Sequence, residues 1–319
     1  MSTTPVSAAD PVAPEPAAAI RSPRRGEGRF GPAEVGLYAV TVFAWSTSWI
    51  AMKAQIGMVE PEVSLLWRFL IAAASMWLLA AGRGERLRTT FAEQGKFALL
   101  GLFLFSTNFA LFYHGASRLP SGLLSVVFSL AAVGNLLLGR VLFRQPISAR
   151  VAFGALCGFL GVAAMFRPQL AGADLTGEAA VGLALCCLGT LSFCSGNMVS
   201  SRLQLAGVPV LAASAWGMTW GCGLLGLYIA VRGLPLVFDP APLYVGSLLW
   251  LALVASVAAF WAYLTLLGRI GAARAGYATV MFPVFALAIS TVLEGYVWTV
   301  SAAIGLGLVL VGNLFVLRR

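Results

Sequence analysis

The amino-acid sequence predicts an all-α integral membrane protein whose ten transmembrane helices form two inverted five-helix repeats. Three observations predict this fold class. Of the 319 residues, 60% are apolar and 10% are charged, whereas a soluble domain has about 25% charged residues. Long apolar runs recur along the chain, and each can cross a hydrocarbon core that needs about 20 helical residues. A pattern in the first half of the sequence also returns in the second half.

The first 33 residues precede the apolar part of the chain and predict a disordered cytoplasmic tail. They combine six prolines and many alanines with a basic cluster at Arg21, Arg24, Arg25 and Arg29. Segments of this composition cannot bury enough apolar surface to fold. Because the tail lacks the apolar core of a secretory signal peptide, we expect the first hydrophobic helix to be retained.

Ten apolar runs follow, and we expect each of them to form one membrane-spanning helix. Only helices and closed barrels satisfy the backbone in lipid, and these runs lack the alternating pattern of barrel strands. The expected spans of the first repeat (34–167) are 35–53, 63–82, 97–115, 121–142 and 149–167. Those of the second repeat (177–317) are 178–198, 209–231, 243–266, 275–293 and 298–316.

The basic residues predict the orientation of these helices. Of the 21 lysines and arginines, sixteen lie in the tail, at the C-terminus and in connectors on the same side, and four lie on the other side. The side richer in Lys and Arg is usually cytoplasmic. We therefore expect both termini in the cytoplasm and the chain in the inner (plasma) membrane. The net charge of +9 is thus explained by basic residues in the connectors on the cytoplasmic side. We expect a lipid bilayer and no nucleic acid as partner.

The two halves resemble copies of one unit. Residues 121–128 (Ser-Gly-Leu-Leu-Ser-Val-Val-Phe) align with residues 275–282 (Ala-Gly-Tyr-Ala-Thr-Val-Met-Phe), and Gly154 and Gly161 match Gly305 and Gly312. Because five is odd, two consecutive five-helix copies must lie in opposite orientations. Inverted repeats of this kind occur in secondary carriers, around a site near the middle of the membrane.

Four short segments read Ala-Trp-Ser-Thr-Ser-Trp-Ile-Ala-Met-Lys (44–53), Leu-Trp-Arg-Phe (66–69), Met-Phe-Pro-Val (281–284) and Leu-Glu-Gly-Tyr (293–296). In this order they resemble the EamA family of the drug/metabolite transporter superfamily, over about residues 35–316. The resemblance implies ten helices with cytoplasmic ends and the movement of metabolites across the inner membrane, often as efflux. Family members usually carry Gly-Glu after the fourth span, but this chain has Gly139-Arg140, and only the second repeat keeps its acid, Glu294.

Arg68 is the only charged residue well inside an expected span, about 9 Å along its helix at about 1.5 Å per residue. A charge at that depth should face a cavity or a partner rather than lipid. Its guanidinium can bind a substrate carboxylate or phosphate. Alternatively, it can have a structural role, reaching the interface or the carbonyls of a helix end.

Aromatic and polar residues at similar depth are candidates for the rest of a substrate-binding site. Trp45 and Trp49 are four residues apart, as are Trp216 and Trp220, so each pair shares a helical face. They could wall a flat or apolar solute, or form an interfacial aromatic belt. The polar candidates, which could instead join helices, are Ser46, Thr47, Ser48, Asn108, Asn135 and Asn197.

Other functions find less support in the sequence. We expect no cofactor, metal or catalytic site, because the five cysteines lack paired spacing and the single histidine, His114, lies at a span end. The twelve acids lie in the tail, in connectors or near span ends, so we expect no buried carboxylate and no proton relay through one. The favoured function is transport of small metabolites, such as amino acids; a channel or a membrane-embedded lipid-modifying enzyme is the alternative. The solute, its direction, the coupling and the oligomeric state stay open.

Overall fold

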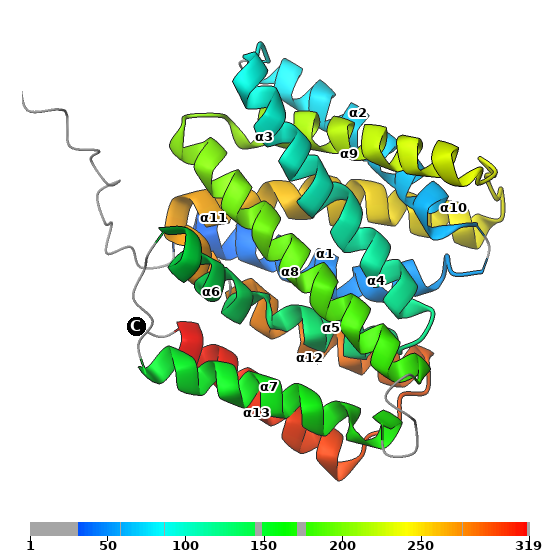
Figure 1. Ribbon diagram of the computed structural model, residues 1–319, viewed down its shortest axis with the longest axis vertical. Coiled ribbons are helices and arrows are strands. Elements are labelled where there is room, and N and C mark those ends of the chain that lie inside the picture. The colour runs from blue at the N-terminus through cyan, green and yellow to red at the C-terminus, as the bar shows by residue number, and fades with distance from the viewer. Residues whose placement is uncertain are drawn as a thin grey trace, which may run out of the picture.

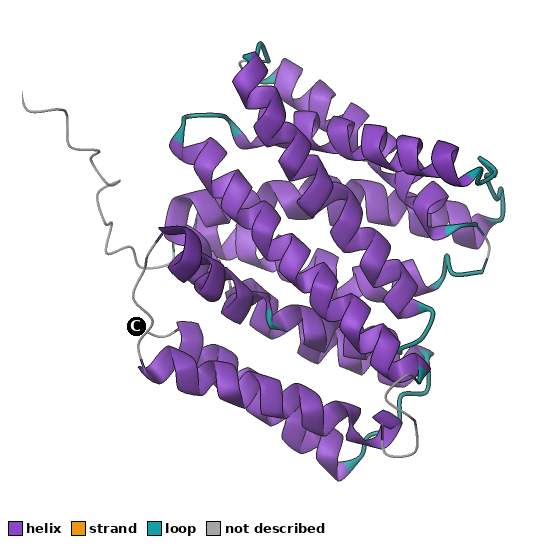
Figure 2. Cartoon of the chain, in the orientation of Figure 1, coloured by secondary structure: helices purple, strands orange, loops and turns teal. Residues whose placement is uncertain are grey.

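The computed structural model describes residues 31–57, 59–85, 87–143, 149–170, 177–275 and 277–317. The tail expected over residues 1–33 lies outside these ranges except for its last three residues. Figure 2 shows that the described part of the chain consists of helices joined by short loops, with no strand among these residues.

The helices follow the expected spans in order. The first half contains α1 (Pro32–Lys53), α2 (Pro61–Gly82), α3 (Phe91–Leu102), η1 (Phe103–Thr107), α4 (Asn108–Ala116), α5 (Ser121–Ser129), α6 (Ala131–Phe143) and α7 (Ala149–Leu170). The second half contains α8 (Glu178–Leu205), α9 (Val210–Arg232), α10 (Pro242–Leu249), η2 (Trp250–Ala258), α11 (Ala259–Ala275), α12 (Tyr277–Leu293) and α13 (Val300–Leu317). The segments η1 and η2 are π-helical and continue directly into the α-helices on either side of them.

Seven helical segments of the described chain are long and apolar enough to cross a membrane. Three shorter apolar helices, Ala152–Phe166, Met281–Leu293 and Val300–Phe315, lie in the fifth, ninth and tenth expected spans. The all-helical fold with several apolar helices is therefore confirmed, while the count of ten spans stays a prediction.

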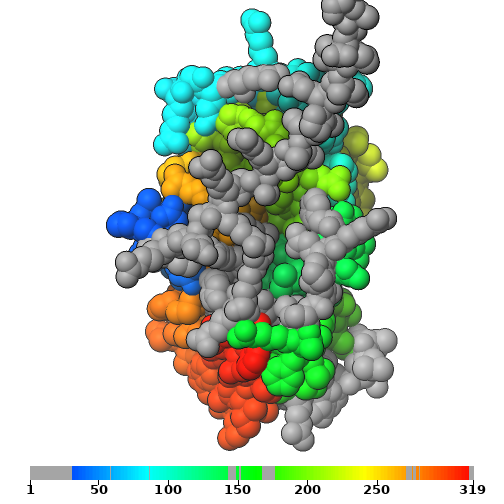
Figure 3. All heavy atoms as spheres, turned by 90° about the vertical axis from the view of Figure 1, so that its left-hand side faces the viewer, coloured from blue at the N-terminus to red at the C-terminus, as the bar shows by residue number. Residues whose placement is uncertain are grey.

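The helices lie side by side and run across the molecule (Figure 1). We call the face where α1 begins and α13 ends the termini side, and the opposite face the distal side. The helices α7 and α13 pack together at one edge of the bundle, and α9 packs on α2 and α3 at the other. Between these edges lie α1, α4, α5, α8, α11 and α12. Seen from the termini side, the α7–α13 pair (green and red) and the ends of α2 and α3 (cyan) mark the two extremes (Figure 3).

Glycines allow α8 to lie directly on the third helical run. Gly182 faces the loop after α4, Gly189 faces α4 and Gly196 faces η1, and an added Cβ at Gly189 would lie 2.9 Å from the ring of Phe112. Small residues repeated at this spacing let helix backbones approach closely, which is how helices associate in lipid. This contact brings Phe193 on α8 toward the centre of the bundle.

Candidate functional site

A small cavity lies near the centre of the bundle. The residues that line it come from α1, α2, α4, α5, α8 and α11: Trp45, Ser48, Trp49, Met52, Arg68, Asn108, Phe109, Phe112, Phe128, Phe193 and Phe260. The centre of a water molecule can occupy about 30 Å³ of it. Since one water needs about 10–15 Å³ measured in this way, the surrounding helices must move apart before a larger solute can enter.

The cavity lies nearer to the distal side. Trp49 is four residues before the distal end of α1, and Arg68 is seven residues after the distal start of α2. At 1.5 Å per residue these positions are roughly 6 and 10 Å from the helix ends. A solute in this cavity would therefore be enclosed by protein within the membrane.

Arg68 is the charged group of the cavity. Its side chain is 2% exposed, its Nε donates a hydrogen bond to Ser256 Oγ at 2.8 Å, and its guanidinium carbon lies 4.3 Å from the centre of the Phe109 ring. The Tyr113 hydroxyl lies beside it. Among the described residues, no carboxylate forms an ion pair with Arg68. Arg68 thus bonds to a hydroxyl inside the bundle, and not to the carbonyls of a helix end.

The π-helical segment η2 positions two of the cavity residues. Ser256, which accepts the bond from Arg68, donates its own proton to the carbonyl of Leu251, five residues earlier, at 2.9 Å. The carbonyl group of Ala255, the residue directly before Ser256, accepts a hydrogen bond from Trp45 Nε1 at 3.2 Å. π-Helical turns are rare and often occur at functional sites, because they alter the register of backbone groups and side chains.

Two buried polar atoms of the cavity wall, Trp49 Nε1 and Asn108 Oδ1, have no hydrogen-bond partner within the described part of the chain. Burying a polar atom without a partner costs about 1–3 kcal/mol. The cavity therefore combines one fixed positive charge, one free N–H donor and one free amide oxygen, surrounded by aromatic rings.

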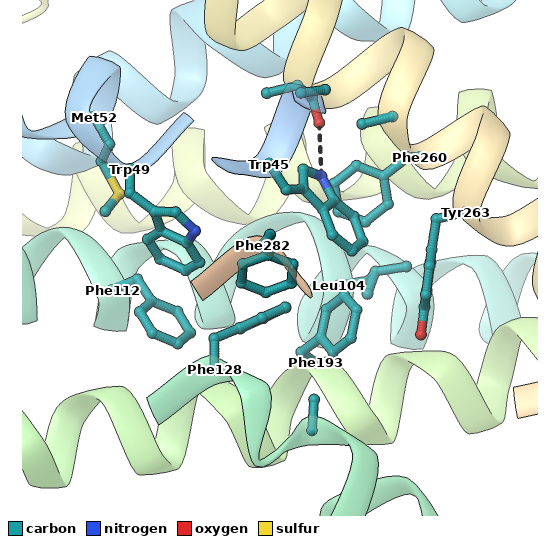
Figure 4. Packing of buried hydrophobic residues seen from close by; sticks show 14 of the residues in the cluster. Trp45, Trp49, Met52, Leu104, Phe112, Phe128, Phe193, Phe260, Tyr263 and Phe282 are labelled. Carbon is teal, nitrogen blue, oxygen red and sulfur yellow. Dashed lines mark hydrogen bonds between the residues drawn. The ribbon is translucent and has the colours of Figure 1, made fainter. Parts of the chain in front are cut away.

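Aromatic rings pack together beside Trp49 (Figure 4), and among them Trp45 is four residues nearer than Trp49 to the start of α1 on the termini side. Trp45 contacts Phe193, Tyr263 and Phe282, with ring centres 5.9, 4.9 and 6.2 Å apart. Phe128 contacts Phe193 and Phe282 at 4.6 and 5.7 Å. We use the name aromatic layer for Trp45, Phe128, Phe193 and Phe282 from here on.

The remaining candidate residues separate into two groups. Asn135 and Asn197 are buried beyond the aromatic layer, where Asn197 donates hydrogen bonds to Asn135 and to Tyr263. Trp216 and Trp220 lie on α9 outside the cavity: Trp216 packs on Trp77 and Phe97, and Trp220 is 39% exposed. The two tryptophan pairs therefore do not wall one common site, because α9 packs on α2 and α3 away from it.

Two hydroxyls of the α1 segment also point elsewhere. Ser46 donates to the carbonyl of Val42 at 2.6 Å, and Thr47 accepts a hydrogen bond from Trp250 Nε1 at 3.2 Å. Only Ser48 of this hydroxyl run lines the cavity, and its hydroxyl bonds to the carbonyl of Trp45 at 2.9 Å. A helix presents neighbouring residues to different sides, which explains the division.

One expectation about charge was wrong. Glu62 is buried, with 6% of its surface exposed, although the sequence predicted no buried carboxylate. It lies in the first turn of α2 on the distal side, where His114 Nε2 approaches its Oε1 to 2.9 Å. The packing of α4 on α2 covers this helix end, which its position in the sequence does not reveal.

Comparisons with known proteins identify the class of protein. The chain is 25% identical over 299 residues to an uncharacterized transporter of Archaeoglobus fulgidus, which covers 88% of this chain and 97% of the relative. It is 23% identical over 260 residues to the uncharacterized transporter YoaV of Bacillus subtilis, covering 79% and 85%. A solved crystal structure that is 17% identical shares the fold, with a TM-score of 0.68 over 89% of this chain and 96% of that chain.

These relatives and the apolar helices define a multi-pass membrane protein that transports small solutes. The model of the EamA-like transporter family matches the chain twice, over residues 34–167 and 180–318. The chain therefore belongs to the EamA-like transporter family, which confirms the resemblance found in the sequence.

Proposed function

We propose that this transporter carries a small amphipathic solute with a carboxylate group, such as an amino acid, by alternating access between two inverted five-helix repeats. The observation that carries the proposal is Arg68, a fully buried cation that faces an aromatic cavity and has no carboxylate partner among the described residues. A buried charge is costly until an opposite charge arrives. The carboxylate of the solute would supply that charge.

The other lining residues fit the rest of such a solute. Phe112, Phe128 and Phe193 would surround its apolar part, while the N–H of Trp49 and the amide of Asn108 remain for a second polar group. Cavities of this composition, mostly apolar with a few placed polar groups, are typical of small-molecule sites. A solute carboxylate can accept hydrogen bonds from Arg68 and from Trp49 Nε1, and a donor group of the solute, such as an ammonium, can bond to Asn108 Oδ1.

Contacts between α7 and α13 support the inverted repeat. An added Cβ at Gly161 would lie 2.6 Å from the carbonyl oxygen of Gly305, and one at Gly312 would lie 2.5 Å from that of Gly154. The sequence alignment pairs Gly154 with Gly305 and Gly161 with Gly312. Exchanging the two halves therefore turns one contact into the other, as a two-fold axis between antiparallel copies requires.

The two π-helical segments support the same symmetry. In each, a serine hydroxyl bonds to the carbonyl five residues earlier at 2.9 Å, Ser106 to Gly101 and Ser256 to Leu251. Each serine is followed seven residues later by a buried tyrosine, Tyr113 or Tyr263. Carriers with inverted repeats hold their site at the repeat interface, which is where this cavity lies if the symmetry holds.

The test is radiolabelled counterflow in proteoliposomes that contain the full chain, with pools of neutral amino acids and of monocarboxylates as solutes. We would compare the native chain with Arg68→Gln, Arg68→Lys and the control Arg232→Gln. The control removes an exposed arginine at the end of α9, outside the residues that line the cavity. Counterflow also separates a carrier from a channel, since a channel does not accumulate label against its gradient.

We expect saturable accumulation by the native chain and by the Arg232 variant. Because a hydrogen bond to a charged group contributes about 1.5–3 kcal/mol, Arg68→Gln should raise the half-saturating concentration by roughly tenfold to a hundredfold. Arg68→Lys should recover only part of this, since it keeps the charge and loses the planar fork. Full transport by Arg68→Gln with unchanged half-saturation would refute the carboxylate-binding role of Arg68.

A further inference from the structure

A second cluster of polar side chains lies on the other side of the aromatic layer. Asn197 Nδ2 donates to Tyr263 Oη at 3.1 Å and to Asn135 Oδ1 at 3.3 Å. Asn135 and Asn197 are 5% and 0% exposed. Each lies eight residues before the termini-side end of its helix, α6 or α8. The cluster therefore sits in the half of the bundle opposite to the cavity.

Two polar atoms of the cluster have no hydrogen-bond partner among the described residues. Asn135 Nδ2 and Asn197 Oδ1 are both buried without a partner. If these amides only joined helices, the two side chains could pair more completely, because each carries both donors and acceptors. One free donor and one free acceptor in the same place fit a hydrogen-bonding guest.

The cluster occupies the position related to the cavity by the inverted repeat. The offset of 150 residues that pairs Ser106 with Ser256 also pairs Tyr113, beside Arg68, with Tyr263 in the cluster. If the two repeats exchange conformations during transport, the surroundings of Tyr263 in one state resemble those of Tyr113 in the other.

Only the aromatic layer separates the two places. The ring of Tyr263 lies 4.9 Å from that of Trp45, and Trp45 lines the cavity. Figure 4 shows Trp49 and Met52 at one end of this row of rings and Tyr263 at the other, with Trp45, Phe193 and Phe282 between them. A rotation of these rings would join the cavity to the cluster.

We propose that Asn135, Asn197 and Tyr263 form a second polar site on the transport path, on the termini side of the aromatic layer. The site offers uncharged amide and phenol groups, so it binds the hydrogen-bonding groups of the solute without a charge partner. It holds the same carboxylated solute more weakly than the Arg68 cavity does. This inference deepens the proposed function and rests on its inverted repeat.

The experiment measures how fast a charged, membrane-impermeant methanethiosulfonate reagent modifies single cysteines. The five native cysteines are free, so they are first replaced by alanine in the full chain, which is then reconstituted in lipid nanodiscs. Asn197→Cys and Asn135→Cys report on the cluster. Asn313→Cys is the matched control, because Asn313 is equally buried and also has an unpartnered amide oxygen, but lies on α13 and bonds to Ser129.

A cysteine thiolate, which forms only where water reaches the sulfur, attacks the reagent, forms a mixed disulfide and releases methanesulfinate. We therefore expect Asn197→Cys and Asn135→Cys to react at least about tenfold faster than Asn313→Cys. Two reporter positions are used so that one variant that fails to fold, as judged by size-exclusion chromatography, does not end the test. Equal, slow modification of all three variants overturns the proposal. A side chain on the transport path must be reached by water when the transporter opens to the termini side.

A second readout tests solute contact. Any solute accumulated in the counterflow assay should slow the modification of Asn197→Cys and leave Asn313→Cys unchanged; a transported solute without this effect overturns the binding role. The labelling rates require no transported solute. A failed counterflow assay therefore rejects the proposed function without deciding the labelling comparison, and the two results remain distinguishable.

Discussion

Arg68 owes its orientation to Ser256, a residue 188 positions away in the sequence. The bond from Arg68 Nε to Ser256 Oγ is 2.8 Å long, and it leaves the terminal nitrogens of the guanidinium for other partners. A rigid, planar cation of this kind can bind a carboxylate through two parallel hydrogen bonds. The serine therefore decides in which direction the charge points.

Replacing Ser256 by alanine should weaken solute binding without abolishing transport. A hydrogen bond to a charged group contributes about 1.5–3 kcal/mol, so the half-saturating concentration in counterflow should rise, by no more than roughly tenfold to a hundredfold. Ser247→Ala is the control, because Ser247 is also buried but bonds only to its own helix, at the carbonyl of Tyr244. The same loss in both variants would mean that any buried serine of this helix matters, and that Ser256 does not act through Arg68.

Trp49→Phe should separate binding from stability. The change removes the unpartnered Nε1–H and keeps an aromatic wall, so the folded protein loses no internal hydrogen bond. We expect weaker solute binding in counterflow together with an unchanged or higher thermal unfolding midpoint, because an unsatisfied buried donor is removed. Trp220→Phe, which breaks a bond to Gln94 outside the cavity, should leave solute binding unchanged. If Trp49→Phe binds solute as the native chain does, then Trp49 only forms part of the cavity wall and donates no hydrogen bond to the solute.

At the scale of elements, the α7–α13 pair depends on glycines at defined positions. Added Cβ atoms at Gly161, Gly305 and Gly312 would collide with backbone oxygens of the opposite helix, whereas one at Gly307 would meet nothing within 4 Å. Two helices can approach this closely only where no side chain intervenes. The faces of α7 and α13 that carry the matched glycines therefore pack directly on each other.

Gly305→Ala should destabilise the protein and Gly307→Ala should not. The new methyl group at position 305 would lie 2.5 Å from the carbonyl oxygen of Gly161, and overpacking of this kind costs about 1–3 kcal/mol. The midpoint of thermal unfolding, followed by size-exclusion chromatography of heated samples, should fall for Gly305→Ala alone. Equal midpoints would show that the pair can separate without cost.

The π-helical segments η1 and η2 are the elements that the sequence did not predict. They occupy the third and eighth expected spans, which read as ordinary continuous apolar helices because hydropathy does not record the hydrogen-bond register. The positions of the α-helices, in contrast, followed closely from the apolar runs, since the length of a span in lipid is fixed by the thickness of the hydrocarbon core.

At the scale of the whole molecule, orientation in the membrane is the main prediction. The described structure has α1 beginning and α13 ending on one side (Figure 1), the side to which the sequence analysis assigns most of the lysines and arginines. We expect a periplasm-active phosphatase fused after Arg319 to be inactive, and the same enzyme inserted at Asp239, between α9 and α10, to be active. An active fusion after Arg319 would reverse the assignment of both faces.

The sequence by itself determined the membrane-spanning helical class, the family and one buried cation, because apolar run length, motif order and an isolated charge are local properties of the chain. Tertiary structure decided which candidates meet: Trp45, Trp49, Arg68 and Asn108 line one cavity, Asn135 and Asn197 join Tyr263 beyond the aromatic layer, and Trp216 and Trp220 lie on another face. It also decided that Glu62 is buried. Helix rotation and the choice of neighbouring helices set these contacts, and both depend on packing between residues far apart in the sequence.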